Sequence, residues 1–346
     1  MSARVSLSVL ESIVDVPFLP VELLNPASLA VATAVTSLYI YFVYPHLLVQ
    51  MYFRIAVRWS GMRLKKVTDE KGFTFVYGER GQASPDRPSV LLLHGFSADH
   101  FMWAPIVQNL PGNIHAVALD LPGHGLSSDP PKEEEIGFGS QLERIRQFLA
   151  LANMEKRKFH VVGVSMGGAL SGLFAARYPE LVSAVTMTCP SMKTPVDGQM
   201  IALHRRAVEE NGGRMTLESC PLLPQNGSDL KTMMEVVCYH RQFVPQQILQ
   251  GAVDLRKQRN HFYLELLHEL VSEHSRCALE AELHKISCPV QVVVHVSGVE
   301  VLKEKVPDLR RVDILACCGH AINLDQPRAF AEVVAQFWAD AQSSSS

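Results

Sequence analysis

The sequence lacks the features that mark two large classes of binding protein. Its 346 residues carry 32 Lys and Arg against 35 Asp and Glu, a formal net charge of −3, so no excess of positive charge indicates a nucleic-acid groove. Its seven cysteines include no C-x-x-C pair, which argues against a zinc site and against a disulfide scaffold. We therefore expect reduced thiols on the cytosolic side of a membrane.

Charged residues are also missing from one long stretch near the N-terminus. No Asp, Glu, Lys or Arg occurs between Glu22 and Arg54. Within this stretch, residues 27–44 are 18 apolar, Ser or Thr residues, about enough to cross a hydrocarbon core as a helix. The aromatic residues that suit an interfacial belt are Tyr39, Tyr41, Tyr44, Tyr52 and Trp59. The pattern predicts a transmembrane anchor.

The charges on either side of this segment predict its orientation. The far flank is basic, whereas the N-terminal flank holds Arg4 against three acidic residues. The positive-inside rule then places everything after the segment in the cytosol. A cleaved signal peptide would need basic residues first and a small-residue cleavage site after the apolar run. That alternative and a buried N-terminal helix both stay open beside an uncleaved, single-pass anchor.

From Phe73 onward, short apolar runs alternate with helical patterns. Fully apolar strands separated by helices indicate a mostly parallel sheet with helices on both faces, an α/β fold. The expected strands are residues 89–93, 115–119, 159–162, 184–188, 290–294 and 312–315, and helical patterns cover 141–153 and 169–178.

One segment interrupts this alternation and completes the expected domain organisation. Residues 191–285 are helical in pattern and rich in Met and Leu, which predicts a helical cap inserted over one end of the sheet. The predicted units are a tail (1–26), the anchor (27–44), a basic juxtamembrane linker (45–72), the first half of the core (73–190), the cap (191–285) and the second half of the core (286–342).

The motif Gly163-Val164-Ser165-Met166-Gly167 follows one expected strand and precedes an expected helix. G-x-S-x-G in this context predicts a nucleophile elbow, a sharp turn that exposes the serine hydroxyl above the sheet. The serine would also lie at a helix N-terminus, which favours negative charge. We therefore predict that Ser165 is a catalytic nucleophile, the alternative being a tight glycine-rich turn with an incidental serine.

An acyl-transfer site also needs two backbone donors for the oxyanion of the tetrahedral intermediate. Met166, directly after the predicted nucleophile, would supply one N–H. The sequence His94-Gly95-Phe96 follows an earlier strand, and Phe96 is the expected second donor. The alternative is that these three residues form only a strand-end turn.

A serine hydroxyl requires a general base at neutral pH. Of the 14 histidines, His320 follows the last expected strand in Cys318-Gly319-His320 and precedes a C-terminal helix that opens at Asp325-Gln326-Pro327. This is where the base of such a site belongs, so we predict His320, with His124 and His295 as weaker candidates.

No Asp follows the expected strand 290–294, where a carboxylate should orient the base. The first carboxylate there is Glu300, in Ser297-x-x-Glu300, which is typical of a helix capping box. Glu300 is therefore only a weak candidate for the acid, and Asp308 and Asp197 are weaker still. The acid stays unassigned.

These motifs resemble the alpha/beta-hydrolase family and, within it, membrane-anchored monoacylglycerol lipases. The resemblance covers nearly the whole chain, including the N-terminal anchor. Its most specific part is the cap segment from Val244 to Gly251. The other matching motifs are His94-Gly95-Phe96-Ser97-Ala98, Met102-Trp103, Asp120-Leu121-Pro122-Gly123-His124, Val164-Ser165-Met166-Gly167-Gly168 and Cys318-Gly319-His320.

The resemblance implies hydrolysis of monoacylglycerols, including 2-arachidonoylglycerol, and of some lysophospholipids. It also implies an integral membrane protein facing the cytosol of late endosomal, lysosomal or plasma membranes. The family's acid is an Asp in a Gly-x-x-Asp loop, and this chain lacks that loop between His295 and Val296. No metal or organic cofactor is expected, because an acyl-enzyme is hydrolysed by water alone.

The missing acid leaves a second reading open, a hydrolase fold held at the membrane that binds lipid or a partner protein without turnover. A third reading, the opening of epoxides or haloalkanes, would require a carboxylate nucleophile at the elbow. Ser165 occupies that position.

Overall fold

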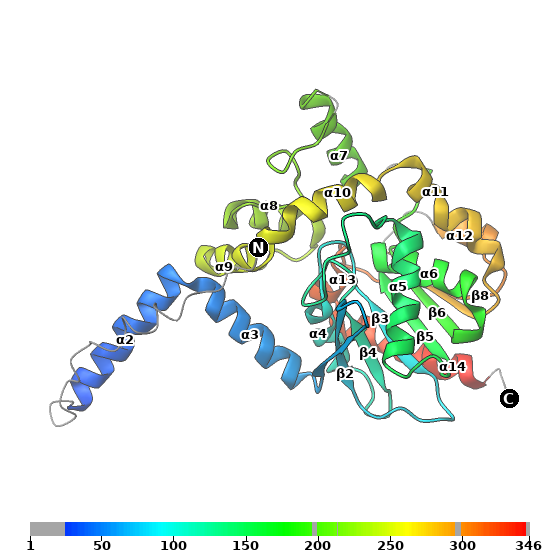
Figure 1. Ribbon diagram of the computed structural model, residues 1–346, viewed down its shortest axis with the longest axis horizontal. Helices are drawn as coiled ribbons and strands as arrows, with labels where there is room; N and C mark the ends of the chain where they lie inside the picture. Colours follow the sequence, from blue (N-terminus) through cyan, green and yellow to red (C-terminus); the bar gives the residue numbers. More distant parts are fainter. Residues whose placement is uncertain (1–24, 196–198, 213, 295–298, 344–346) are drawn as a thin grey trace.

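The computed structural model describes residues 25–195, 199–212, 214–294 and 299–343 (Figure 1). In this part of the chain an eight-stranded sheet has the order β1-β2-β4-β3-β5-β6-β7-β8. β2 is antiparallel to β1 and β4, and the other neighbours are parallel. The strands are β1 (Arg63–Thr68), β2 (Thr74–Arg80), β3 (Ser89–Leu93), β4 (Ala116–Leu119), β5 (Phe159–Val164), β6 (Val182–Thr188), β7 (Val290–Val294) and β8 (Leu309–Ile314).

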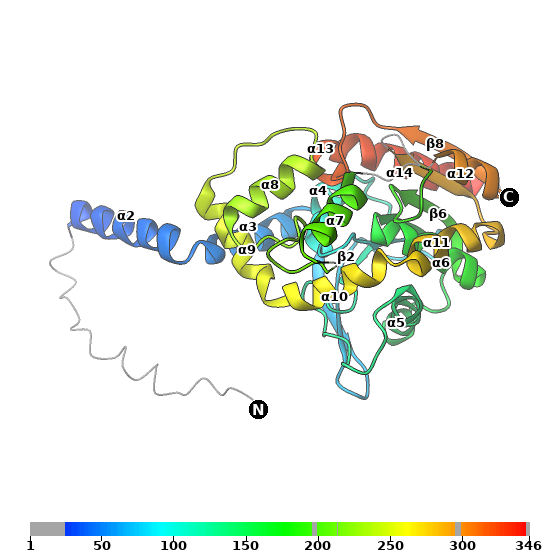
Figure 2. The ribbon, with the colours of Figure 1, turned by 90° about the horizontal axis from the view of Figure 1, so that it is seen from above.

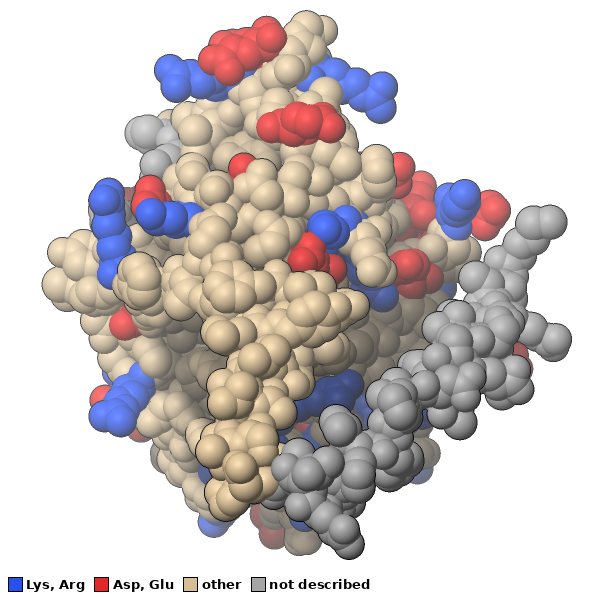
Figure 3. Space-filling view, turned by 90° about the vertical axis from the view of Figure 1, so that its left-hand side faces the viewer, with Lys and Arg blue, Asp and Glu red and all other residues tan. Residues whose placement is uncertain are grey.

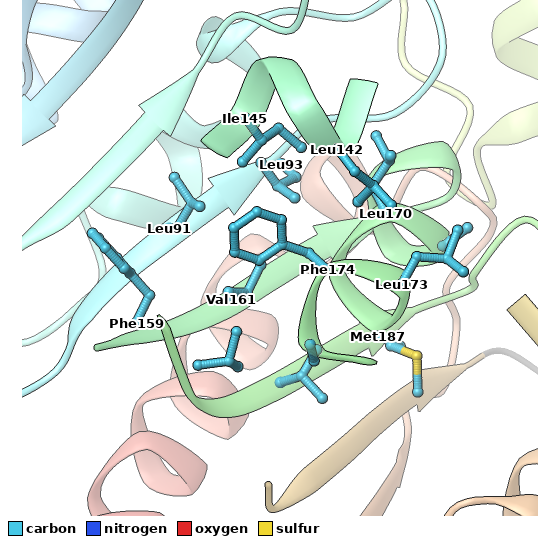
Figure 4. Close-up of a cluster of buried hydrophobic side chains, with 14 of the residues drawn as sticks. Leu91, Leu93, Leu142, Ile145, Phe159, Val161, Leu170, Leu173, Phe174 and Met187 are labelled. Atoms are coloured by element: carbon cyan, nitrogen blue, oxygen red, sulfur yellow. The ribbon is translucent and has the colours of Figure 1, made fainter. Parts of the chain in front are cut away.

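Helices cover both faces of this sheet because its central strands are apolar on both sides. α5 (Phe138–Leu151) and α6 (Met166–Arg177) pack on one face, where Phe174 lies over Leu91 and Val161 (Figure 4). α4 (Ala104–Val107) and α14 (Pro327–Ser343) pack on the other. The prediction of an α/β fold with helices on both faces is confirmed.

The region predicted as a basic linker, residues 45–72, is instead a helix and a strand. α3 (Pro45–Trp59) follows the N-terminal helix, and β1 pairs with β2 at the edge of the sheet. The sequence of β1 is Arg-Leu-Lys-Lys-Val-Thr, and its residues are mostly exposed. Charged side chains are common on edge strands because they discourage pairing with other chains. From composition alone, a charged edge strand such as β1 therefore cannot be told from a basic linker.

A helical insertion separates β6 from β7. It comprises α7 to α11, and its contacts with the loops after β3, β4 and β8 place it over the carboxyl ends of the strands (Figure 1). Its helices in the described residues are α7 (Gln199–Glu210), α8 (Gly227–Val237), α9 (Gln246–Arg256), α10 (Asn260–Leu270) and α11 (Glu273–Glu282).

The remaining elements are short connections and the N-terminal helix. The connections are η2 (His100–Trp103), η3 (Pro179–Leu181), η4 (Lys257–Arg259), η5 (Leu283–Lys285), α12 (Val299–Lys305) and α13 (Ile322–Asp325). The N-terminal helix, α2 (Pro26–Val43), projects from the body (Figure 2) and has no buried residue. Among the residues described, it is the one helix long and apolar enough to cross a membrane, with a mean hydropathy of 1.5.

Candidate active site

Ser165 occupies a strained turn between a strand and a helix. β5 ends at Val164 and α6 begins at Met166, so Ser165 is the single residue between them. Its φ of 59° and ψ of −118° lie in a region that non-glycine residues rarely adopt and that is often found at functional sites. The Ser165 N–H donates to the Thr188 carbonyl at 2.9 Å, which fixes the turn against β6.

Two glycines make this turn sterically possible. A Cβ on Gly163 would lie 1.9 Å from the Gly167 carbonyl oxygen, and one on Gly167 would lie 2.1 Å from the Leu93 carbonyl oxygen. Both neighbours are backbone atoms and cannot rotate away. The motif glycines therefore let α6 start directly against β3 and β5.

Replacing Gly163 with alanine should destabilise the fold by about 3 kcal/mol or more, because the added methyl overlaps backbone. Gly139→Ala is the matched control. Gly139 lies at an exposed position of α5, and its Cβ would have no neighbour within 4 Å, so alanine there should stabilise the fold by about 0.5–1 kcal/mol. Thermal unfolding of the two variants measures the difference, and equal stability would contradict the steric argument.

The loop after β3 lies against this serine. A Cβ on Gly95 would be 3.4 Å from the Ser165 Cβ and 4.0 Å from its Oγ. The Leu121 N–H donates to His94 Nε2 at 2.9 Å, so the ring proton is on Nδ1. The His94 Nδ1–H therefore donates to the Gly95 carbonyl at 2.8 Å.

This hydrogen bond fixes the direction of the predicted oxyanion donor. The Gly95 carbonyl and the Phe96 N–H belong to one planar trans peptide and point in opposite directions. The Gly95 carbonyl also accepts from the Ala98 N–H at 3.3 Å. Holding the carbonyl on one side thus holds the Phe96 N–H on the other. His94 is a positioning residue that the sequence motif did not single out as such.

His124, a weaker candidate for the base, is buried behind this loop. Its ring centroid lies 4.9 Å from that of His94 and 5.0 Å from that of Tyr263. Its Nδ1 donates to the Pro122 carbonyl at 2.9 Å. Burial lowers the pKa of His124 well below its usual range, and the neighbouring His94 lowers it further.

His320, the predicted base, is half-buried in the loop after β8, on the same edge of the sheet as Ser165. The preceding residue lies tightly against the helical insertion, since a Cβ on Gly319 would be 2.6 Å from the Val237 carbonyl oxygen. The Ala321 N–H donates to the same carbonyl at 2.8 Å. The backbone on both sides of His320 is thus attached to the end of α8.

The Asp325 carboxylate completes this attachment, and no sequence motif points to this role. It accepts from the N–H groups of Gly319 and Tyr239, each at 2.8 Å, and of His240 at 2.9 Å. In sequence, Asp325 resembles an ordinary residue at the start of the C-terminal helix. Its partners lie 85 and 86 residues away in the insertion, so local pattern could not predict the contact.

We expect Asp325→Asn to lower kcat about 10- to 100-fold with little change in KM, since a small displacement of the base is costly while substrate contacts remain. Asp308→Asn is the matched control, because Asp308 lies at the amino end of β8, away from the site. Steady-state kinetics and thermal unfolding are measured together. A loss of activity fully explained by a lower melting temperature would contradict a positioning role. A rise in KM at constant kcat would contradict it too.

The candidates for the acid have different environments. β7 ends at Val294 and α12 begins at Val299. Glu300, in the first turn of α12, is 84% exposed at its side chain and pairs with Lys303 at 3.1 Å, as a surface ion pair does. Asp308 pairs with Arg310 at the opposite end of the strands. Asp197, His295 and Ser297 lie outside the described residues, so the predicted capping box does too.

Arg256, the last residue of α9, connects the insertion to the predicted oxyanion loop. Its Nη2 donates to the Ser97 Oγ at 2.8 Å and to the Leu222 carbonyl at 3.2 Å. Its Nε is shielded from solvent and has no hydrogen-bond partner in the described residues. Burial lowers the pKa of the guanidinium, whereas Tyr263 and Asp99 raise it through their charge. No motif in the sequence marks Arg256 as a functional residue.

One group in the described residues has the donor types of a cation site. It consists of Asp99, His100 and Asp120. Asp120 Oδ1 accepts from the His100 N–H at 2.7 Å and is 2.8 Å from His100 Nδ1, and Oδ2 accepts from the Leu126 N–H at 2.8 Å. These contacts explain the cluster as a support for the loops after β3 and β4.

Comparisons with known proteins agree with this geometry. A family model described as the alpha/beta hydrolase fold matches residues 88–256. Monoacylglycerol lipase ABHD6 of Homo sapiens is 35% identical over 86% of this chain and 89% of its own length. Monoacylglycerol lipase abhd6-A of Xenopus laevis is 34% identical over 88% and 90%.

Solved structures show the same fold. A bacterial membrane phospholipase A, described as a virulence factor, covers 91% of this chain and 97% of its own, with a TM-score of 0.75 and 25% identity. The haloalkane dehalogenase DbeA from Bradyrhizobium elkani has a TM-score of 0.65 at 20% identity, covering 82% of this chain and 99% of its own, which shows the fold alone. The chain therefore belongs to the alpha/beta-hydrolase family, as a carboxylic ester hydrolase related to monoacylglycerol lipase ABHD6.

Proposed function

We propose that this protein hydrolyses monoacylglycerols at a membrane, through an acyl-enzyme formed on Ser165. The observation that carries the proposal is the strained turn at Ser165, which places one hydroxyl at the start of α6 beside the loop of Gly95. The names of the relatives supply the substrate class. Lysophospholipids are further candidate substrates, because they also carry a single acyl ester.

In the first half of the proposed reaction, His320 takes the proton of the Ser165 hydroxyl as the Oγ attacks the acyl carbon. The N–H groups of Phe96 and Met166 stabilise the oxyanion. His320 then gives the proton to the departing glycerol oxygen as the ester bond breaks. Glycerol leaves, and the acyl chain stays on Ser165.

In the second half, a water molecule gives a proton to His320 and attacks the acyl-enzyme. The same two N–H groups stabilise the second oxyanion. The bond to Ser165 then breaks, the proton returns to the Oγ, and the fatty acid is released. Besides the ester, the proposed reaction consumes only water. The Met- and Leu-rich insertion offers adaptable apolar side chains for the acyl chain.

We also propose that α2 anchors the protein across a bilayer with the hydrolase body in the cytosol. Its 18 residues span about 27 Å at the rise of an α-helix, close to the thickness of a hydrocarbon core. Arg54 and Arg58, which follow it, favour a cytosolic location. By resemblance, the host membrane is late endosomal, lysosomal or plasma membrane.

The second candidate function is lipid or partner binding without turnover. It is favoured by the segment between β7 and α12, residues 295–298, whose sequence His-Val-Ser-Gly contains no carboxylate. Loss of the acid costs about 10⁴-fold in kcat in well-studied serine proteases and leaves residual activity.

The test measures fatty acid released from monoacylglycerol in vesicles by the purified full chain, with Ser165→Ala as the control. Release that depends on Ser165 supports hydrolysis and excludes the binding-only function. If the parent releases no more fatty acid than Ser165→Ala but still binds lipid, hydrolysis is excluded and the binding-only function is supported.

A further inference from the structure

Helix α3 carries an exposed apolar stripe on a rigidly held support. Leu47, Met51, Ile55 and Trp59 are all exposed, Trp59 by 82% and Met51 by 55%. Residues four apart follow one another along one side of a helix, so these side chains form a continuous strip. Tyr52, also exposed, extends the strip on its far side.

The opposite side of α3 is packed against the protein. Val49 and Val57 are buried, and the ring of Phe53 stacks on that of Phe101 at 3.9 Å. The helix also lies very close to α9, since a Cβ on Gly251 would be 2.6 Å from the Pro45 carbonyl carbon. The stripe is therefore held in place facing away from the body.

The charges of α3 are all of one sign. Its sequence contains Arg54 and Arg58 and no Asp or Glu. On a helical wheel both arginines lie at the edge of the stripe that Leu47 begins, because each residue turns the helix by 100°. An apolar strip bordered by cations has the pattern of a helix that lies in a membrane interface, where lipid head groups carry negative charge.

The position of α3 in the chain identifies the surface that the stripe faces. α2 ends at Val43 and α3 begins at Pro45, and the two helices run in different directions from this junction (Figure 1). The sequence of α2 contains no charged residue. Figure 3 shows the molecule from the side on which this helix projects. If α2 crosses the bilayer, α3 must start at the bilayer surface.

We propose that the apolar stripe of α3 lies in the head-group region of the bilayer and holds the helical insertion against the membrane. This inference rests on the proposed anchoring by α2. The chain of contacts continues inward, because α3 packs on α9, and Arg256 at the end of α9 donates to the hydroxyl of Ser97 beside the predicted oxyanion loop. Membrane contact thus sets the orientation of the site toward lipid substrate.

Trp59 provides a direct optical test. The protein has three tryptophans, and the other two, Trp103 and Trp338, are buried. The full chain is reconstituted in vesicles of phosphatidylcholine with a fraction of phosphatidylserine, and the difference between the parent and Trp59→Phe isolates the Trp59 signal. We expect a blue-shifted emission that dibrominated phosphatidylcholine quenches and aqueous iodide does not.

Two other outcomes would overturn the proposal. Quenching by iodide but not by the brominated lipid would mean that the stripe faces water. Protection from both quenchers would mean that protein, such as a second copy of this chain, covers it.

A kinetic test separates this inference from the proposed function. Met51→Glu with Ile55→Glu should lower kcat/KM on vesicle-embedded monoacylglycerol about tenfold and leave hydrolysis of a soluble short-chain ester unchanged. Met51→Leu with Ile55→Leu is the matched control and should behave as the parent does. Equal loss on both substrates would contradict an interfacial role, whereas a parent inactive on both would contradict only the proposed function and leave the fluorescence result decisive.

Discussion

Ser165→Ala should abolish covalent labelling of the protein by a fluorophosphonate probe and lower ester hydrolysis by about 10²-fold. In subtilisin the loss of the serine alone costs about 2 × 10⁶ in kcat and the loss of the acid alone about 3 × 10⁴. The sequence assigns no acid to this chain, so we expect about two orders of magnitude to be left for the serine to supply. The strained backbone at Ser165 favours labelling at this residue.

Labelling stoichiometry and initial rates measure this effect. Ser140→Ala is a matched control, because Ser140 lies near the start of α5, where its hydroxyl donates to the Gly137 carbonyl. It should label and turn over as the parent does. Labelling that persists in Ser165→Ala would assign the nucleophile elsewhere, and unchanged hydrolysis would exclude an acyl-enzyme on this residue.

Inserting a Gly-x-x-Asp loop between His295 and Val296 should raise kcat by about 10³- to 10⁴-fold. The added carboxylate would hold the imidazole of His320 in one tautomer and stabilise the imidazolium that forms during the reaction. In the chain with the insertion, Ser165→Ala should then cost about 10⁶-fold instead of about 10², because serine, base and acid act as a unit.

The same insertion with Asn in place of Asp is the control, since it keeps the loop length and removes the charge. A gain with Asp but not with Asn assigns the effect to the carboxylate. Equal rates for the parent and the two insertion variants would mean that another group already orients the base. In that case Ser165→Ala should lower kcat of the parent by about 10⁶-fold.

Local sequence pattern predicted the central part of the fold and much of the candidate site. The run at residues 290–294 is buried from end to end as β7, as expected for a mostly apolar strand covered on both faces. Its one polar side chain, Gln291, is hydrogen-bonded to Thr186 and Asp313. The turn at Ser165 was predictable because its glycines are required by contacts within a few residues and with one adjacent strand.

Other features depend on partners that the sequence does not bring together. β1 carries the charges of an edge strand and has the composition of a linker. Arg256 and Asp325 look like ordinary helix-end residues, and their partners, Ser97 and Tyr239, belong to distant segments. Isolated long-range contacts such as these produce no periodic pattern in the sequence, so they could not be predicted from it.

The carboxylate bridge of Asp325 has a mechanical consequence. It ties the end of α8 to the loop of His320 through three backbone N–H groups, so the link depends on the Asp325 side chain alone. A displacement of α8 would therefore move the backbone on both sides of His320 with it. The position of the helical insertion and that of the predicted base are thereby coupled, so a change at α8 is transmitted to the loop that carries the imidazole.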